Sequence, residues 1–522
     1  MLLHNFLTES AQKYPDKVAV IFRGHRITYG ELDRQANRLA WVLIALGVER
    51  GDRVAVFLDN SLESVVALFG ILKTGAAFVM VSAAAKAGKV ELILNHCGAR
   101  VLISHSGKHD VLDSLAVPGL LKIIIGESAT RQNPQDISWA EVMAASADHC
   151  PTRQNIDLDL AALIYTSGST GDPKGVTLTH LNMVSAATSI ISYLKNTPDD
   201  IIMNVLPLSF DYGLYQVLMA IKFGGTVILE KSFLYPYAVI DKMIREKVTG
   251  FPLVPTIAAM ILQLESLKNY EFNSLRYITN TGAALSENHI RKLRSIFPQA
   301  AIYSMYGLTE CKRVSYLPPE ELDRRPHSVG KPMPNVETFI VDEQGRKVGP
   351  GVVGELVVRG SNVMRGYWCD PEETARVLKA GRYPGETVLY TGDFFRMDEE
   401  GYLFFVGRKD DLIKTRGERV APREVENVLH QIEGVVEAAV IGVPDELLGQ
   451  AVKAFILSRE GKILEEKEII AHCAARLEFF MVPKYIEFLE EFPRTSTGKI
   501  DRKALAMGER RHNEQFPDRE RL

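Results

Sequence analysis

The sequence predicts an α/β fold in which a large N-terminal domain, made of layered α/β sheets plus a β-barrel-like unit, is followed by a small, mobile α+β C-terminal domain. The chain has 522 residues, too many for one ordinary domain. Apolar strand-like runs alternate with amphipathic segments up to about residue 330, and short strands separated by glycine and proline follow up to residue 407. These observations indicate several large buried sheets.

The alternating pattern of the first part predicts helices layered on mostly buried strands. Examples are "RVAVFL" (Arg53–Leu58), "TVILE" (Thr226–Glu230) and "LRYITNTG" (Leu275–Gly282). Continuous apolar runs of this length are typical of strands that are covered on both faces. The longer apolar stretch Val65–Ala85 carries Lys73 at its centre and is interrupted by glycine, so it predicts a helix, a turn and a strand instead of a membrane span.

The second part of the chain predicts hairpins and then a separate domain. The runs "ETFIVD", "GELVVRG" and "GYLFFVG" are short and bounded by turn residues, which favours a barrel-like β unit. The charged "RKDD" after Gly407 separates this unit from a β–turn–helix pattern whose helix begins at Pro422. The predicted domains are therefore 1–409 and 410–522.

Composition narrows the class of protein. With 46% hydrophobic and 24% charged residues and a net charge of −4, the chain is typical of a globular protein and gives no reason to expect nucleic acid as a partner. The five cysteines are scattered without metal-ligand spacing. The N-terminus lacks the pattern of a signal peptide. We therefore expect reduced thiols, no transmembrane segment and a cytoplasmic location.

One short stretch carries chemistry. "TSGSTGDPKG" (Thr166–Gly175) follows an apolar strand and combines small residues, hydroxyl groups and a lysine. Small residues let backbone N–H groups approach an anion, and Lys174 adds a positive charge. Pro173 before the lysine and a glycine after it differ from the P-loop pattern of ordinary NTPases. The stretch therefore predicts a phosphate-binding loop of another kind.

This loop resembles the signature of the adenylate-forming (AMP-binding) superfamily, which includes acyl-CoA synthetases, adenylation domains of peptide synthetases and luciferase. Further stretches are similar to its other motifs and follow in the expected order. They are "ITYGEL" (Ile27–Leu32), "MYGLTE" (Met305–Glu310), "GELVVRGSNVMRGYW" (Gly354–Trp368), "YTGDFFRMDEEGYLFFVGRKDDLIKTRGERVAPREVE" (Tyr390–Glu426) and "PRTSTGKIDRKAL" (Pro493–Leu505). The resemblance spans almost the whole chain and implies that a carboxylate attacks the α-phosphate of ATP, after which a thiol displaces AMP.

The resemblance also implies roles for particular residues. Glu310 corresponds to the Mg²⁺ ligand, and Thr309 would contact the α-phosphate. Lys499 would reach the reacting carboxylate from the second domain, which would rotate about Asp410. The ATP phosphates would be bound by Thr166, Ser167, Gly168, Ser169, Thr170, Gly171 and Lys174. Adenine and ribose would be bound by Gly282, Ala283, Ala284, Tyr306, Asp393 and Arg408. Lys414 and Gly417 would line the channel for the thiol.

The acid and the acceptor remain open at this stage. By alignment with the family, the pocket would be lined by Asp211, Tyr212, Tyr215, Thr279, Thr281, Met305, Leu308, Arg313 and Val314. Asp211 follows Phe210 where many acyl-CoA synthetases have histidine, so it either binds the ammonium of an amino acid or forms hydrogen bonds within its loop. Lys312 or Arg313 would meet a second acidic group on the substrate, or the pair would face solvent.

The implied activity is that of an AMP-forming acyl-CoA synthetase that uses ATP, Mg²⁺ and coenzyme A. The alternative is a stand-alone amino acid:carrier-protein ligase that loads a phosphopantetheine thiol. More distant alternatives are a branch that passes the adenylate to oxidation or to an amine, and a nucleotide-binding regulatory protein without turnover. The presence of both Lys499 and Glu310 argues against the last of these.

Overall fold

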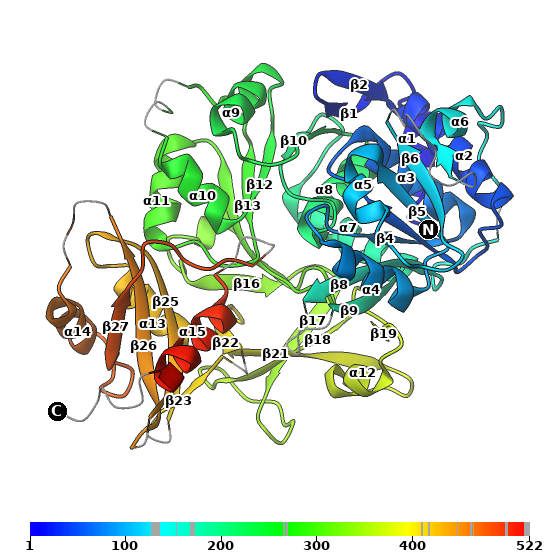
Figure 1. Cartoon of the computed structure of the whole chain (residues 1–522). Helices are drawn as coiled ribbons and strands as arrows, with labels where there is room; N and C mark the ends of the chain where they lie inside the picture. The colour runs from blue at the N-terminus through cyan, green and yellow to red at the C-terminus, as the bar shows by residue number, and fades with distance from the viewer. Residues whose placement is uncertain are drawn as a thin grey trace.

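The computed structural model describes residues 1–126, 136–152, 154–167, 173–264, 267, 270–408, 411–415, 418–445, 447–459, 462, 464–495 and 500–515. Within these residues the strands form three sheets, of fourteen, eight and five strands. Figure 1 shows the first two sheets and their helices as the larger body, with the third sheet beside them. The mixed α/β architecture with a small C-terminal part agrees with the sequence prediction.

The largest sheet joins the parallel strands of the first part to the antiparallel strands of the second. Its order is β17-β18-β21-β22-β16-β15-β14-β13-β12-β10-β11-β1-β2, with β20 on β21. In that order the strands are Val336–Val341, Gly354–Gly360, Thr387–Met397, Leu403–Arg408, Ser328–Pro332, Ser315–Leu317, Ala301–Tyr306, Tyr277–Asn280, Gly250–Leu253, Ile201–Asn204, Thr226–Leu229, Val18–Phe22, His25–Thr28 and, for β20, Leu378–Ala380. The strands predicted as a β unit thus continue the larger sheet through β15 and β16.

The second sheet has the order β19-β9-β8-β4-β3-β5-β6-β7, and the third has the order β24-β23-β26-β25 with β27 on β26. The strands of the second are Gly366–Tyr367, Pro173–Thr179, Leu160–Ser167, Ala77–Met80, Arg53–Phe57, Val101–His105, Leu121–Ile125 and Ile137–Ser138. Those of the third are Glu418–Val420, Ile413–Thr415, Gly449–Ser458, Val435–Asp445 and Tyr485–Phe488.

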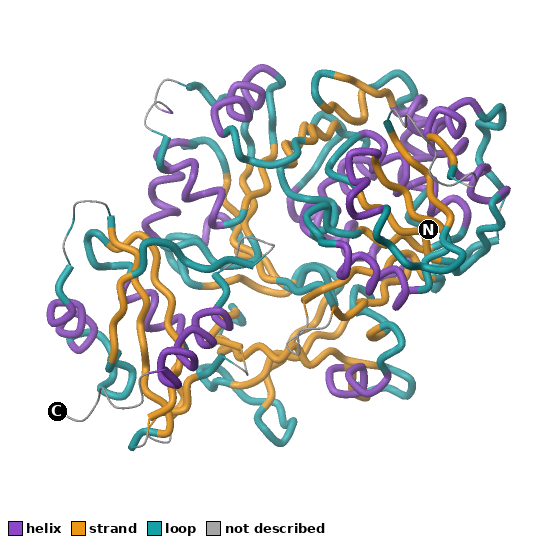
Figure 2. Tube along the Cα trace, in the orientation of Figure 1, coloured by secondary structure: helices purple, strands orange, loops and turns teal. Residues whose placement is uncertain are grey.

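Helices pack against these sheets, as Figure 2 shows. They are α1 Asn5–Lys13, α2 Tyr29–Ala45, α3 Leu62–Thr74, α4 Ala87–Cys97, α5 His109–Leu112, α6 Trp139–Ala144, α7 His180–Leu194, α8 Asp211–Phe223, α9 Pro236–Arg245, α10 Pro255–Leu262, α11 Glu287–Ile296, α12 Pro371–Val377, α13 Pro422–Leu429, α14 Glu466–Ala474 and α15 Arg502–Gln515. Of these, α3 and α8 are buried along most of their length. Helix α13 begins at Pro422, as predicted.

Local sequence explains how the apolar stretch from Val65 folds. The side chain of Ser61 caps α3, and Gly75 ends it in the left-handed conformation with φ 86°, which costs glycine little. The strand β4 follows at once and is buried along its length. The helix–turn–strand prediction is confirmed. Among the described residues, no helix combines the length and apolar character needed to cross a bilayer.

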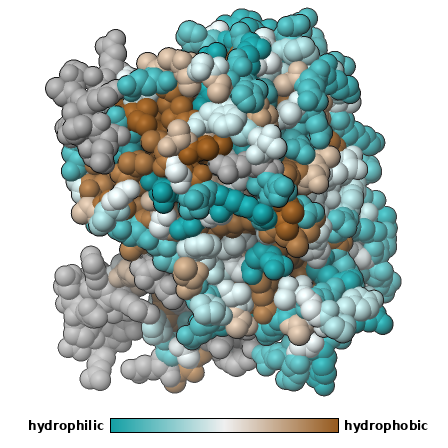
Figure 3. Space-filling model, turned by 90° about the vertical axis from the view of Figure 1, so that its right-hand side faces the viewer, coloured by the Kyte–Doolittle hydropathy of each residue, from teal (hydrophilic) through white to brown (hydrophobic). Residues whose placement is uncertain are grey.

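The hydrophobic cores follow the division into sheets. One continuous cluster of buried side chains joins the first two sheets and ends at Leu403. The clusters around the third sheet begin at Ile413 and contain no earlier residue among those described. Figure 3 shows one face of the molecule, on which hydrophobic residues gather in one large area and in smaller ones between hydrophilic residues. The C-terminal part therefore has a core of its own.

Candidate active site

The two ends of the glycine-rich stretch pair with each other in the second sheet. Strands β8 and β9 pair antiparallel, with Thr166 opposite Lys174. This pairing brings the first predicted phosphate ligand and the lysine to the same end of the hairpin. The side chain of Ser167 and the predicted ligands Gly168, Ser169, Thr170 and Gly171 lie outside the described residues.

Lys174 is held by an acidic side chain from a distant part of the chain. Its Nζ lies 2.6 Å from Oε1 of Glu373 on α12, and both side chains are largely buried. The ammonium also lies 5.4 Å from the ring centre of Tyr367. A buried, oriented cation at the end of this hairpin can bind a phosphate group if it exchanges or shares its carboxylate partner.

Tyr367 connects the hairpin to the predicted metal ligand. Its strand β19 pairs with β9, which places Tyr367 opposite Val176. The Tyr367 hydroxyl donates a 2.8 Å hydrogen bond to Oε1 of Glu310. Burial, followed by the nearby Glu310 carboxylate, raises the pKa of Tyr367, so the phenol stays protonated as a donor. Sequence reasoning did not single out Tyr367, although the residue lies in the motif "GELVVRGSNVMRGYW".

Glu310 and Thr309 lie on a tight turn between β14 and β15. A Cβ at Gly307 would lie 2.2 Å from the carbonyl oxygen of Lys312, so the turn requires glycine there. The buried Nδ2 of Asn362 donates to the carbonyls of Cys311 (2.7 Å) and Arg313 (2.9 Å). The main chain of this turn is therefore fixed from outside it.

The predicted nucleoside ligands meet at the edge of the large sheet. Asp393 on β21 lies opposite Arg408 on β22, with Arg408 Nε 3.3 Å from Asp393 Oδ1. The Tyr306 hydroxyl donates to Asp393 Oδ2 at 2.6 Å. Burial raises the pKa of Asp393, and Arg408 opposes this effect. The carboxylate is thus desolvated and oriented, ready to accept hydrogen bonds from hydroxyl groups.

The segment after β13 presents small side chains near the end of the strand. Gly282 has φ 87°, a left-handed conformation that favours glycine, and it is exposed together with Ala283. The carbonyl of Ala283 accepts a 2.9 Å hydrogen bond from Nδ2 of Asn280. Ala284 is half-buried. A planar base could lie against this exposed backbone without meeting a large side chain.

An ion pair lies among the predicted acid-pocket residues. Lys312 Nζ lies 3.3 Å from Oδ2 of Asp211 and donates to the Asp211 carbonyl at 2.8 Å. The ammonium also lies 4.4 Å from the ring centre of Tyr215. Burial lowers the pKa of Lys312 to about 7, and Asp211 works against this shift. The side chain of Asp211 already has a cation from the protein, which differs from the open aspartate that the amino-acid hypothesis requires.

The expectation that Lys312 and Arg313 form a solvent-facing pair is wrong. Their exposed fractions are 4% and 2%, because the turn directs both side chains into the space between α8 and the large sheet. The Tyr212 hydroxyl lies 2.6 Å from Oγ1 of Thr279 and tethers α8 to β13. The remaining predicted pocket residues Thr281, Met305 and Val314 are buried, and Leu308 is half-buried.

The structure describes the neighbours of the predicted site residues in the C-terminal part, but few atoms of those residues themselves. Lys499, Asp410, Gly417 and the side chain of Lys414 lie outside the described residues. The backbone of Lys414 belongs to β23, and Ile500, next to Lys499, bridges to Arg494. Arg423 on α13 lies 5.8 Å from the ring centre of Phe405 on β22. The C-terminal part thus contacts the strand that carries Arg408.

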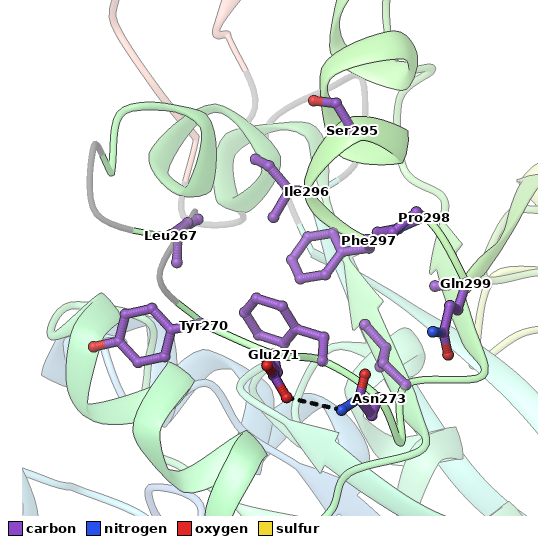
Figure 4. Close-up of a pocket in the computed structure, with 12 residues that line it drawn as sticks. Leu267, Tyr270, Glu271, Asn273, Ser295, Ile296, Phe297, Pro298 and Gln299 are labelled. Carbon is purple, nitrogen blue, oxygen red and sulfur yellow. Dashed lines mark hydrogen bonds between the residues drawn. The ribbon is translucent and has the colours of Figure 1, made fainter.

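A separate cavity lies away from these residues. It measures about 420 Å³ and is lined by Leu267, residues 270–273, Leu275 and residues 295–300, the first two of which end α11. Figure 4 shows Tyr270, Phe297 and their neighbours around it, with a hydrogen bond from Asn273 to Glu271. None of the predicted site residues lines it. Its mostly apolar walls carry none of the charged groups that phosphate chemistry requires.

Comparisons with known proteins agree with the motif order. The model of the AMP-binding enzyme family matches residues 7–368, and that of the AMP-binding enzyme C-terminal domain matches residues 424–499. The long-chain-fatty-acid–CoA ligase of Bacillus subtilis is 32% identical over 534 positions, covering 96% of this chain and 94% of that protein. Tyrocidine synthase 1 of Brevibacillus parabrevis is 29% identical, covering 96% of this chain but 44% of that protein.

The fold gives the same result. The crystal structure of ATP-bound MatB from Rhodopseudomonas palustris matches with a TM-score of 0.88 and 29% identity, covering 97% of this chain and 99% of that one. The agreement of sequence, fold and motif order over nearly the full length leaves no room for a chance match of single motifs. The chain therefore belongs to the adenylate-forming superfamily of AMP-binding enzymes and is an acid–thiol ligase of the acyl-CoA synthetase type.

Proposed function

We propose that this protein activates a carboxylic acid with ATP as an acyl-adenylate and then transfers the acyl group to the thiol of coenzyme A. The observation that carries the proposal is the meeting of four motifs: Lys174 lies over the ring of Tyr367, the Tyr367 hydroxyl binds Glu310, and the Tyr306 hydroxyl binds Asp393. Tyr306 and Glu310 lie four residues apart, so the phosphate side and the ribose side of the site share one turn. This arrangement fits an extended nucleoside triphosphate.

In the first half-reaction a carboxylate oxygen of the substrate attacks the α-phosphorus of ATP, and the bond to the pyrophosphate oxygen breaks. Lys174 and the hairpin loop would hold the leaving pyrophosphate. Thr309 would orient the α-phosphate, and Lys499 would donate to the reacting carboxylate. Such donors act by lowering the energy of charge that develops during transfer, so their placement dominates the rate.

A magnesium ion fits the donor set at Glu310. Among the described residues, no group of three His, Cys, Asp or Glu side chains could hold a metal ion. Mg²⁺ is usually bound by one or two carboxylates together with phosphate oxygens and water, which Glu310 and ATP could supply. Bound there, the ion would neutralise phosphate charge. Tyr367 would hold the Glu310 carboxylate in the orientation that binding requires.

In the second half-reaction the sulfur of the thiol attacks the acyl carbon, and the bond between that carbon and AMP breaks. We infer that the part after residue 409 rotates about Asp410 between the two halves, which would withdraw Lys499 and bring Lys414 and Gly417 to the site. The separate hydrophobic core of this part supports such a movement, because rotation would break few buried contacts.

The ion pair of Asp211 and Lys312 favours, as substrate, a carboxylic acid that lacks an α-ammonium group over an amino acid. An aspartate that binds a substrate ammonium needs to be free of protein cations, whereas Asp211 contacts Lys312 at 3.3 Å. We therefore favour coenzyme A over the thiol of a carrier protein as the acceptor of the acyl group. The similarity to tyrocidine synthase 1 keeps the carrier protein as the second candidate.

ATP–pyrophosphate exchange with the purified enzyme tests the first half of the proposal. A panel of fatty, aromatic, dicarboxylic and amino acids should show exchange with acids that lack an α-ammonium group, and the matching adenylate should then form a thioester with coenzyme A. Exchange with amino acids alone would establish the second candidate instead. An enzyme that exchanges pyrophosphate with no acid would contradict the proposal.

A further inference from the structure

Among the residues that the structure describes, the buried guanidinium of Arg313 has no acidic partner. The residue is 2% exposed and is among the largest fully buried side chains of the described chain. Its Nε and Nη1 atoms have no hydrogen-bond partner among the described residues. Because arginine stays charged at all ordinary pH values, this side chain keeps a positive charge inside the protein.

The other buried basic side chains of the described chain each have a carboxylate. Arg325, which is 7% exposed, contacts Glu321, Asp398 and Glu400. Lys73 lies 2.5 Å from Asp33, and Lys312 lies 3.3 Å from Asp211. Arg313 differs from these buried cations because it has no carboxylate partner among the described residues. Buried polar groups without partners are rare in native proteins, so the exception needs an explanation.

In the described part of the chain, the surroundings of Arg313 are aromatic and carry no carboxylate free to bind it. Its guanidinium carbon lies 5.4 Å from the ring centre of Tyr212 on α8. Burial raises the pKa of Tyr193 to about 12, and the nearby charge of Arg313 opposes this effect. The Tyr193 hydroxyl lies 3.1 Å from Sδ of Met305. The acidic group of this region, Asp211, is already bound to Lys312. The guanidinium therefore lies among the predicted acid-pocket residues.

The position of Arg313 is fixed relative to Glu310. The two residues belong to the same turn, three positions apart, so their Cα atoms are at most about 11 Å apart. Asn362 holds the carbonyls of both Cys311 and Arg313. A substrate whose reacting carboxylate lies near Glu310 would therefore extend its other end towards Arg313 over only a short distance.

We propose that the acid activated by this enzyme is a short dicarboxylic acid, of which one carboxylate reacts with ATP while the other is bound by the guanidinium of Arg313. This inference deepens the proposed function and rests on it. A guanidinium donates charge-assisted hydrogen bonds to carboxylate oxygens, and Nε and Nη1 of Arg313, which have no partner among the described residues, are each a donor for such a bond. The aromatic side chains around it exclude water, which strengthens the interaction.

Matched acids test this specificity. Pyrophosphate exchange is measured with short dicarboxylic acids and with the monocarboxylic acids of the same chain length. For the unmodified enzyme we expect kcat/KM to be roughly 10- to 150-fold higher for the dicarboxylic member, as for other hydrogen bonds to charged groups. In Arg313→Met this ratio should fall towards one, and Arg313→Lys should keep an intermediate ratio.

Thermal unfolding separates a binding role from a structural one. Arg313→Met removes an uncompensated buried charge, so its Tm should stay equal or rise. The control Arg325→Met removes the arginine shared by Glu321, Asp398 and Glu400, of which, among the described residues, Glu400 alone keeps a second basic partner in Arg324, so its Tm should fall. A fall in Tm for Arg313→Met that matches the control would overturn the inference. So would a preference of the unmodified enzyme for monocarboxylic acids, which would leave the proposed function intact. Exchange with no acid at all would instead refute the proposed function.

Discussion

The hydroxyl of Tyr367 lies 2.8 Å from Oε1 of Glu310, and the same tyrosine ring lies below the ammonium of Lys174. One side chain from β19 thus contacts the two charged groups expected to flank the ATP phosphates. Tyr367→Phe should lower the rate of adenylate formation by roughly 10- to 150-fold, since a hydrogen bond to a charged group contributes about 1.5–3 kcal/mol. Pyrophosphate exchange at varied Mg²⁺ concentration measures the effect.

The apparent KM for Mg²⁺ should rise in Tyr367→Phe, because the carboxylate of Glu310 loses its orienting donor. Tyr383→Phe is a matched control, because the side chain of Tyr383 is exposed and lies outside the candidate site. Equal rates and equal Mg²⁺ dependence in both variants would show that Tyr367 does not position Glu310.

The pair of Asp211 and Lys312 predicts a stability effect. Asp211→Ala should lower the free energy of unfolding by about 3–5 kcal/mol, because it leaves a buried ammonium without its partner. Urea denaturation measures this change, and the double variant Asp211→Leu with Lys312→Met should recover most of it. Unchanged stability together with loss of activity towards amino acids alone would identify Asp211 as an ammonium ligand instead.

Lys312 also predicts how stability changes with pH. Burial lowers its pKa from the ordinary 10.5 to about 7 in the folded protein. Between these values the unfolded chain binds more protons than the folded one, so the penalty for burying Lys312 is full below pH 7 and is relieved as the pH rises. Stability relative to the double variant Asp211→Asn with Lys312→Met should therefore increase between pH 7 and pH 9.5.

The slope of that increase should reach at most about 1.4 kcal/mol per pH unit. Chemical denaturation of both proteins at several pH values gives the difference directly, and other titrating groups cancel because they are shared. A constant difference over this range would mean that Lys312 remains charged in the folded state.

Lys499 predicts a separation of the two half-reactions. Lys499→Ala should raise the activation free energy of adenylate formation by about 3–4 kcal/mol. Thioester formation from supplied acyl-adenylate should be retained. Pyrophosphate exchange measures the first half-reaction, and release of AMP from supplied adenylate with coenzyme A measures the second. Lys503→Ala is the neighbouring control on α15. Equal loss of both halves would contradict the rotation about Asp410.

Much of the fold followed from local pattern. Runs such as Arg53–Leu58 were long and apolar enough to identify buried strands, and Pro422 marked the start of α13. The continuation of the large sheet through β15 and β16 was not predictable, because it depends on pairing between strands far apart in the chain. Short hairpin patterns show that strands exist but not which neighbour they pair with.

The site residues that belong to one contiguous motif were predictable. Those whose role depends on a partner far away in sequence were less so. Tyr306, Glu310 and Asp393 were named from their motifs, and the structure describes contacts at each of them. Tyr367 and Glu373 were not named, since their partners lie far away in sequence. The burial of Arg313 was expected only from alignment with the family, because two adjacent basic residues in a turn are by themselves typical of a solvated surface.

The side chain of Asn362 donates hydrogen bonds to main-chain carbonyls of the turn that follows Glu310, those of Cys311 and Arg313. The anchoring is therefore indifferent to which amino acids occupy positions 311 and 313. Laboratory evolution that randomises positions 311 and 313, and keeps Lys312 with its ion pair to Asp211, should alter which acids the enzyme accepts while leaving the backbone around Glu310 in place.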